Sequence, residues 1–360
     1  MSSQKKKRLL RPWWILLFLV LCYFIAKKFL LPSSFSFDET ITFESGDTMN
    51  VVYEKMSSSQ KRTVRWYLFR NKGELETIQL GNYVFSGNYT PASLIETINN
   101  WPTRTYEKIT LLEGRSIYDI DAYLSKQWYI NAGEYISYVS NQENIITIAS
   151  KYPFVQQFLS SKPSNTPSQI SLEWLLYPDT YHINPNQPVI DQLVSLQLKA
   201  FQTKVFWPYQ SQIDNFTSSL QQWGYTFTLW RYNIVTLASI IEKEERNNAN
   251  KPTIAGIFLN RIQAGMRIDA DITLCYGLKT GYEICTPSLI VKSISDASNL
   301  YNTRVHSGLT PTPIANPSAS TFKALLEFNT TDNYYYLHGS DGKIYYGKSI
   351  SEHNANKQYL

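Results

Sequence analysis

Hydrophobic positions follow three different patterns along this chain. Residues 12–31 form an apolar run interrupted only by Lys27 and Lys28, and its 20 residues match the ~30 Å hydrocarbon core of a bilayer. Between residues 38 and 160, short strand-like stretches alternate with apolar positions at helical spacing. Longer helical periods follow from residue 168 onward, and the segment 333–347 is aromatic and strand-like. The pattern predicts an α+β protein, with helices expected at 188–205, 209–222, 232–247 and 250–264.

The apolar run at 12–31 predicts an uncleaved transmembrane helix. A basic head at residues 1–11 precedes it, and this head contains five cations and no acid. Under the positive-inside rule, the head stays in the cytoplasm and everything after the span lies outside it. A cleaved signal peptide is the alternative, although no clear A-x-A cleavage site follows the apolar core.

The region 38–160 contains a degenerate repeat. Residues 41–52 and 109–120 align at an offset of 68, and both indicate a strand, a glycine turn, a Ser or Thr cap and a short helix. A related piece occupies residues 83–90. Such units resemble LysM-like modules, which bind glycans, and a simple spacer is the alternative. The alternating stretch 61–69 predicts a strand, and a Ser/Pro-rich loop at 160–170 predicts the start of a separate mixed α/β domain at 168–360.

Charge and composition exclude several function classes. The chain carries 34 Lys and Arg against 29 Asp and Glu, but residues 1–31 contain seven cations and no acid. The rest is close to neutral, which does not support a basic nucleic-acid-binding surface. The four histidines are scattered without an H-E-x-x-H motif, and no phosphate-binding loop is present. We therefore expect neither a metal nor a cofactor.

The helix expected at 232–247 contains the strongest candidate for acid/base chemistry. Its apolar positions recur at helical spacing, and Glu242 falls on the edge of that face. Half-burial would raise the pKa of Glu242 and suit it to act as a general acid. The alternative is an ion pair between Glu242 and Arg246 on a solvated face. Glu244 and Glu245 are rival acids if the helix register differs.

The loops after this helix are rich in short polar side chains set among prolines and glycines. They include residues 265–277, 301–303 and 308–317. Sites that bind sugar hydroxyls and acetamides need such groups. Cys275 and Cys285 flank a turn-rich stretch, so a hairpin-closing disulfide is reasonable outside the cytoplasm, and two free thiols are the alternative.

Several motifs in this order resemble the endolytic murein transglycosylase family, the MltG-type or YceG-like proteins. The matching segments cover nearly the whole chain; they are residues 113–114, 177–181, 237–244, 258–261, 265–267, 271–277, 301–303, 308–317 and 352–354. The sequence departs from the family pattern at Asp269, Ile272, Thr310 and Ser318, which lie on the proposed substrate loops.

The resemblance implies a lytic transglycosylase that cleaves the MurNAc-β-1,4-GlcNAc bond of nascent peptidoglycan and leaves a 1,6-anhydro end. It implies Glu242 as the acid and base, anchoring in the cytoplasmic membrane, and peptidoglycan synthases as possible partners. The expected substrate-binding residues are Asp271, Thr273, Tyr276, Tyr301, Asn302, Thr303 and Asn316. A hydrolytic muramidase that uses Glu242 and Asp271, or a non-catalytic glycan-binding scaffold, are the alternatives.

Overall fold

The computed structural model describes residues 16–23, 34–44, 46–100, 102, 104–185 and 187–360. The basic head at 1–11 and most of the predicted span at 12–31 lie outside these residues. Residues 16–23 are helical, and no helix in the described part is long and apolar enough to cross a bilayer. The membrane anchor therefore remains a prediction.

The chain divides into two compact units, residues 1–107 and 108–360. The sequence placed its domain boundary at residues 160–168 instead. Residues 108–160 lie with the second unit because Ile109, Leu111 and Leu124 are buried in the same hydrophobic core as the later helices. Of the repeat, residues 41–52 and 83–90 thus fall in the first unit, and residues 109–120 fall in the second.

The first unit packs short antiparallel strands against three helices. Strand β2 pairs with β3, with Ile41 opposite Tyr83, and alternate residues of both strands face the core. Its elements are β1 (Phe35–Ser36), β2 (Glu39–Phe43), α2 (Asn50–Glu54), α3 (Ser58–Arg70), β3 (Gly81–Phe85), β4 (Asn88–Tyr89), α4 (Pro91–Asn99) and β5 (Arg104–Thr105). The strand–turn–helix order expected from the repeat is present here.

The strand predicted at 61–69 is wrong, because this segment is helix α3. A capping box starts the helix: Gln60 N donates to Ser57 Oγ, and Ser57 N donates to Gln60 Oε1 at 2.7 Å. The side chains that face the core, Thr63 and Val64, and the partly buried Tyr67 and Leu68 follow a helical spacing.

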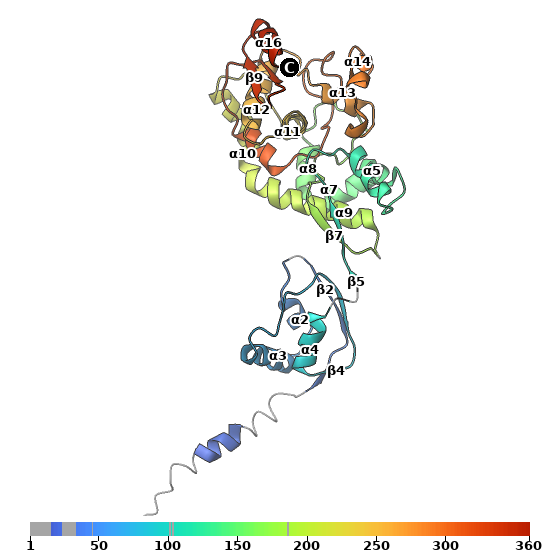
Figure 1. The fold of residues 1–360 in the computed structure, drawn as a ribbon, viewed down its shortest axis with the longest axis vertical. Helices are drawn as coiled ribbons and strands as arrows, with labels where there is room; N and C mark the ends of the chain where they lie inside the picture. The colour runs from blue at the N-terminus through green and yellow to red at the C-terminus, as the bar shows by residue number, and fades with distance from the viewer. Residues whose placement is uncertain (1–15, 24–33, 45, 101, 103, 186) are drawn as a thin grey trace, which may run out of the picture. The chain divides into compact units, whose positions relative to one another are not determined.

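The second unit is mainly helical (Figure 1), and its described strands form two small pairs, β6 with β7 and the antiparallel hairpin of β8 and β9. The four helices predicted from residue 188 onward are confirmed to within a few residues, and the segment 333–347 forms the β8–β9 hairpin. Its elements are β6 (Glu107–Thr110), α5 (Ile117–Lys126), α6 (Glu134–Ser140), α7 (Gln142–Lys151), α8 (Pro153–Leu159), β7 (Thr180–Ile183), α9 (Val189–Phe201), η1 (Gln202–Phe206), α10 (Trp207–Gln222), α11 (Arg231–Glu244), α12 (Lys251–Gln263), α13 (Asp271–Gly277), η2 (Tyr282–Ile284), α14 (Pro287–Ser293), α15 (Ala319–Leu326), β8 (Tyr335–His338), β9 (Ile344–Gly347), α16 (Ile350–Asn356) and η3 (Lys357–Tyr359).

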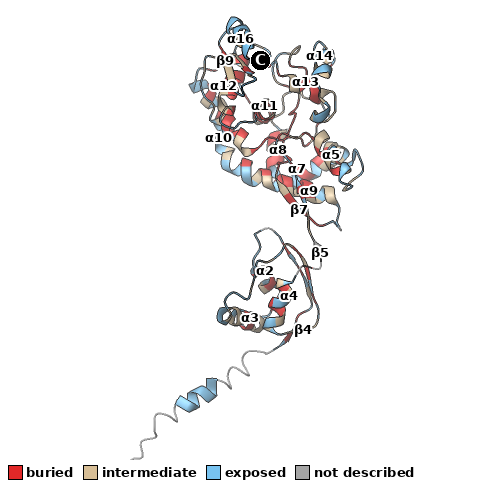
Figure 2. Cartoon of the chain, in the orientation of Figure 1, coloured by how far each residue is buried: buried red, intermediate tan, exposed pale blue. Residues whose placement is uncertain are grey.

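Helix α11 lies at the centre of the second unit. It contacts α8, α10, α12, α13 and α15, and every residue from Ile234 to Glu242 is buried (Figure 2). The carboxyl end of α11 is therefore held rigidly by neighbours on several sides.

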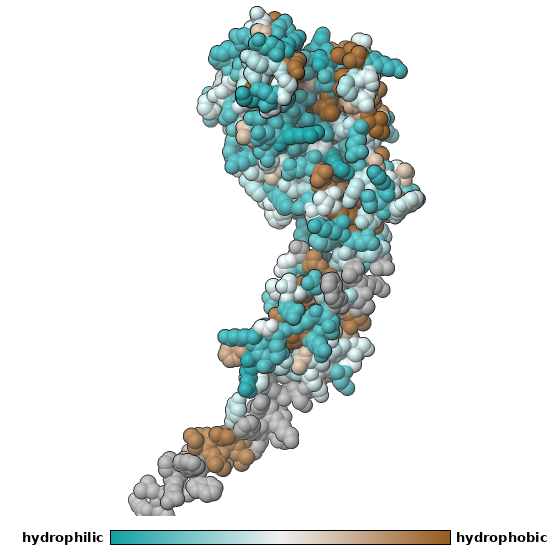
Figure 3. Space-filling view, viewed as in Figure 1, coloured by the Kyte–Doolittle hydropathy of each residue, from teal (hydrophilic) through white to brown (hydrophobic). Residues whose placement is uncertain are grey.

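On the face drawn in Figure 3, hydrophobic side chains gather over α13 and α14, and Ile284 and Val291 are exposed in this part of the chain.

Candidate active site

Helix α11 ends with Glu242, Lys243 and Glu244, and the C-cap residue Glu245 follows. Successive side chains of a helix point about 100° apart, so Glu242, Lys243, Glu244 and Glu245 cannot share one environment. The structure therefore separates three carboxyl groups that the sequence leaves as rivals.

Glu242 is buried in an ion pair. Its Oε1 accepts a hydrogen bond from Lys251 Nζ at 2.9 Å, and both side chains are at most 4% exposed. Its Oε2 accepts hydrogen bonds from Ser318 N and Oγ, both at 2.8 Å, and from Thr321 Oγ1. Both carboxylate oxygens thus have donors from the protein.

These contacts keep Glu242 ionised. Burial would raise the pKa of Glu242, but the positive charge of Lys251 and the hydrogen bonds from Thr321 and Ser318 outweigh it and hold the pKa below its usual value. The raised pKa expected from the sequence is therefore wrong in direction. The pairing with Arg246 is also not observed, since the cation bound to Glu242 is Lys251.

The pKa of Glu244 is shifted in the opposite direction from that of Glu242. Its side chain is half-buried, and Tyr336 Oη donates a hydrogen bond to its Oε2 at 2.7 Å. Burial raises the pKa of Glu244, and the negative charge of Asp271 raises it further. The Tyr336 hydrogen bond and the charges of His338 and Arg261 oppose this rise without cancelling it. Glu244 is therefore the carboxyl that retains a proton to higher pH while staying within reach of solvent.

The other two charged residues hold neighbouring elements in place. Glu245 is buried and accepts hydrogen bonds from Asn247 N at 2.6 Å and from Asn250 Nδ2 at 3.2 Å. Its Oε2 also lies 3.3 Å from His338 Nε2 on β8. Lys243 Nζ lies 3.6 Å from the ring centroid of Tyr282, and burial lowers the pKa of this lysine.

Five of the seven predicted substrate-binding residues are buried, and the structure uses them inside the protein. Thr273 and Thr303 hydrogen-bond each other through their hydroxyls at 2.9 Å. Asn302 donates through Nδ2 to the carbonyls of Ile294 and Asp296. The ring of Tyr276 packs between neighbouring tyrosines. These contacts shape the loops beside α11, and they occupy the polar groups that the sequence assigned to a sugar.

Asn316, the fifth buried residue, joins three segments. Its Oδ1 accepts from Leu176 N, and its Nδ2 donates to Arg115 O at 3.0 Å and to Glu173 Oε1 at 2.6 Å. Glu173 also accepts from Ile117 N at 2.9 Å, and burial raises the pKa of Glu173 to about 8. The sequence reading missed Glu173, although a single acid within the apolar run 170–176 is a signal that could have identified it.

Asp271 and Tyr301, the remaining two predicted residues, are partly exposed. Asp271 forms a short ion pair with Arg304, whose guanidinium also lies 3.2 Å from Asp269. Tyr301 Oη hydrogen-bonds Thr312 Oγ1 at 2.7 Å. Asp271 also raises the pKa of Glu244 through its negative charge. Because Asp271 and Tyr301 are both partly exposed, they can contact a ligand directly.

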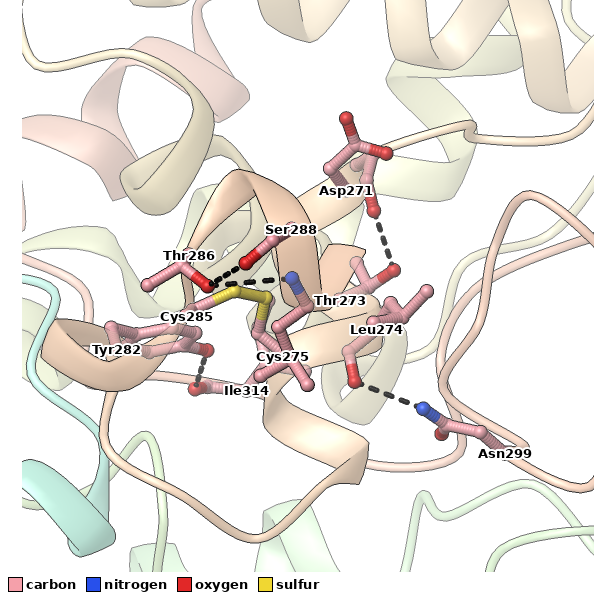
Figure 4. The surroundings of a disulfide bond; sticks show 12 residues. Asp271, Thr273, Leu274, Cys275, Tyr282, Cys285, Thr286, Ser288, Asn299 and Ile314 are labelled. Atoms are coloured by element: carbon pink, nitrogen blue, oxygen red, sulfur yellow. Dashed lines mark hydrogen bonds between the residues drawn. A yellow bond between two sulfur atoms is a disulfide. The ribbon is translucent and has the colours of Figure 1, made fainter. Parts of the chain in front are cut away.

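A disulfide fixes the loop beside these residues (Figure 4). Cys275 on α13 and Cys285 after η2 are joined, with their Cα atoms 5.8 Å apart. Between them, Tyr282 donates a hydrogen bond through its hydroxyl to Ile314 O at 2.6 Å. This hydrogen bond helps to hold the Tyr282 ring against Lys243. No cluster of His, Cys, Asp and Glu suited to a metal occurs among the residues that the structure describes.

The glycine of the 113–114 motif approaches the same helix. Gly114 adopts φ +70°, and a Cβ at this position would lie 3.4 Å from Glu242 Cγ. The negative charge of Glu242 adds to burial in raising the pKa of Glu113. Residues 113–114, which are far from α11 in the sequence, therefore lie beside its carboxyl end.

Comparisons with known proteins agree with this arrangement of motifs. The model of the YceG-like family matches residues 41–359. The chain belongs to the YceG-like family. An endolytic murein transglycosylase of Bacillus subtilis is 25% identical over 81% of this chain and 75% of its own length. Another, from Streptococcus pneumoniae, is 26% identical over 63% of this chain, which spans only 39% of that relative.

A solved structure supports the fold of this YceG-like chain. The crystal structure of a putative YceG-like protein from Listeria monocytogenes superposes with a TM-score of 0.56 and is 22% identical. The match covers 90% of this chain and 98% of that one. At this identity, the likeness supports the fold alone.

The buried ion pair generates a stability prediction. Lys251→Met leaves an uncompensated carboxylate in the core and should lower the free energy of unfolding by about 3–5 kcal/mol. The double variant Lys251→Met/Glu242→Gln should recover part of that loss. Lys323→Met is the matched control, because Lys323 pairs with Glu327 at the surface, 4.0 Å apart, and should change stability by less than ~1 kcal/mol. Chemical denaturation of the four proteins measures these differences.

The pH dependence supplies a second readout for the same pair. The pKa of Glu242 is lowered on folding, so its contribution is present above the usual value of 4.5 and is lost as the pH falls below it. Glu242→Gln should remove that acid-side loss. An equally steep acid-side loss in the variant would contradict an ionised Glu242.

Proposed function

We propose that this protein is a lytic transglycosylase that cleaves the β-1,4 bond after N-acetylmuramic acid in nascent peptidoglycan. The names of its relatives support the reaction and the substrate class. The observation that carries the chemistry is the position of Glu244 at the end of α11, where its half-buried carboxyl accepts a hydrogen bond from Tyr336 Oη at 2.7 Å. Cleavage of this kind would help to end strand elongation.

In the proposed mechanism, one carboxyl group acts twice. Glu244 first protonates the glycosidic oxygen, and the bond from that oxygen to C1 breaks. The C6 hydroxyl of the same sugar then closes on C1, and its proton passes to the Glu244 carboxylate. No water is consumed, and the product is a 1,6-anhydro ring. Because the nucleophile belongs to the substrate, a second carboxylate is not needed to activate it.

The geometry favours Glu244 over Glu242 as the acid. A general acid must hold a proton and reach the substrate, and Glu242 is ionised, buried and bonded to four protein donors. Glu242 is better suited to position the end of α11 and the loop that contains Ser318. The sequence-based assignment to Glu242 stands as the alternative.

A hydrolytic muramidase is the second candidate for the reaction. It would need Asp271 as a partner carboxylate, and Asp271 is the charged neighbour that raises the pKa of Glu244. Asp271 forms an ion pair with Arg304, which suits it to orient a substrate. A non-catalytic scaffold would need neither acid.

Mass spectrometry of released muropeptides tests the reaction and the assignment together. Wild-type protein should release products one water lighter than hydrolytic ones from uncrosslinked strands. Glu244→Gln should lower the rate at least about 100-fold, since general acid–base catalysis contributes at least that much. Glu242→Gln should lose much less activity than Glu244→Gln when both proteins are folded.

Other outcomes of this experiment point elsewhere. Products that contain an added water would establish a hydrolase and promote Asp271. Loss of activity in a folded Glu242→Gln protein, with Glu244→Gln active, would return the assignment to Glu242. No release by folded wild-type protein would favour the scaffold.

The pH profile tests the protonation state of Glu244. As a general acid, Glu244 must be protonated, so kcat/KM should fall as the pH rises through its raised pKa. Tyr336→Phe removes a hydrogen bond that lowers this pKa, and should move the falling limb to higher pH. Tyr345→Phe is the control, because Tyr345 donates to Asp341 and not to a carboxylate of α11. An unmoved limb in Tyr336→Phe would argue against Glu244.

The location of the protein is part of the same proposal. Residues 12–31 anchor the chain in the cytoplasmic membrane, and both units face outward, where the disulfide and the glycan strands belong. Peptidoglycan synthases are possible partners there, and the strand–turn–helix pieces of the first unit are LysM-like glycan contacts or a spacer. Alkaline phosphatase fused after Leu360 should be active in cells, because it folds only outside the cytoplasm. An inactive, intact fusion would contradict this orientation.

A further inference from the structure

A hollow opens on the surface of the second unit, lined by residues that take no part in the proposed mechanism. Its volume is about 410 Å³, and its lining includes Trp223, Asn260, Gln263, Thr330, Thr331 and Asp332. This volume falls within the range of ~300–1,000 Å³ that is usual for small-molecule sites. The lining combines two aromatic residues, Trp223 and Tyr225, with amide, hydroxyl and carboxylate groups.

Trp223 is unusually exposed for its size. It ends helix α10, and 63% of the residue is accessible to solvent. The chain turns away at Gly224, which adopts φ +87°, and a Cβ there would meet no atom within 4 Å. The indole ring therefore stands at the edge of open space and offers a flat apolar face with a polar N–H.

The polar groups of the hollow are held in fixed orientations. Asn260 accepts from Tyr225 Oη at 2.8 Å and donates to Thr331 O at 2.6 Å. Gln263 is exposed and accepts through Oε1 from Thr226 N at 3.0 Å, and its amide also carries a donor, Nε2. Thr330 and Asp332 are exposed at the rim. A ring bearing hydroxyl and acetamide groups could thus stack on Trp223 and hydrogen-bond at its edges.

One continuous segment links this hollow to the end of α11. Thr331 and Asp332 line the hollow, and Tyr336, four residues beyond Asp332, donates to Glu244. Four residues span at most about 14 Å. A polymer of several sugar rings is long enough to contact both places.

We propose that this hollow is a saccharide subsite that stacks a pyranose ring of the glycan strand on Trp223. The inference rests on the proposed function, because it names a second place where that substrate is held. The subsite binds glycan without contacting the bond that is cleaved, so it favours long strands over short ones.

Binding of a β-1,4-linked N-acetylglucosamine hexamer to the full chain in detergent micelles tests the subsite separately from cleavage. Isothermal titration should show about tenfold weaker binding for Trp223→Ala, a loss of about 1.4 kcal/mol. Trp207→Ala is the matched control, because Trp207 begins the same helix, is 60% exposed and is not among the lining residues. Its affinity should match that of the wild type.

Kinetics distinguish a subsite from a general defect. With long uncrosslinked strands, Trp223→Ala should raise KM about tenfold and leave kcat unchanged, and with a tetrasaccharide it should change neither. Gln263→Ala should shift KM in the same direction. Equal hexamer binding by wild-type and Trp223→Ala proteins of equal thermal stability would overturn the proposal. Hexamer binding that depends on Trp223, without any cleavage by the wild type, would keep the subsite and reject the proposed reaction.

Discussion

The buried pair of Lys251 and Glu242 is the constraint on which the second unit depends. Two charges removed from water are tolerated only when each finds its partner and its remaining hydrogen bonds. Lys251 meets this condition through Glu242 and Thr321, and Glu242 through Ser318, Thr321 and Lys251. The pair therefore fixes the end of α11 against the start of α12 and the N-terminal turn of α15.

This constraint separates the roles of two acids that lie two residues apart. Glu242 points into the pair and stays ionised, while Glu244 points toward Tyr336, Asp271 and Arg261 and retains its proton more strongly. Perturbation of neighbouring carboxyl groups in opposite directions is typical of sites that use one of them as an acid. Because the ion pair fixes Glu242, the rigid helix also fixes the position of Glu244.

The sequence predicts the helices of the second unit well, because their apolar positions repeat at helical spacing over many turns. It fails at 61–69, where a short alternation also fits a helix whose start depends on the Ser57–Gln60 capping box. The polar loops after α11 are correctly located, but a cluster of Asn, Thr and Tyr does not reveal whether it faces inward. Thr273, Asn302 and Asn316 face inward and organise the loops.

The protonation states could not be predicted from the local sequence. The donors that lower the pKa of Glu242 are 9, 76 and 79 residues away, and the tyrosine that donates to Glu244 is 92 residues away. Such contacts exist only after folding. The family motifs point to a segment with three candidate glutamates, and the three-dimensional contacts shift the pKa values of Glu242 and Glu244 in opposite directions.

The most direct test of this account is a carbon-13 NMR titration of the glutamate side-chain carboxyls, assigned with the Glu242→Gln and Glu244→Gln proteins. The resonance missing from Glu244→Gln should titrate above the usual pKa of 4.5, and the one missing from Glu242→Gln below it. The reverse order would contradict the division of roles at the end of α11 and would make Glu242 the acid.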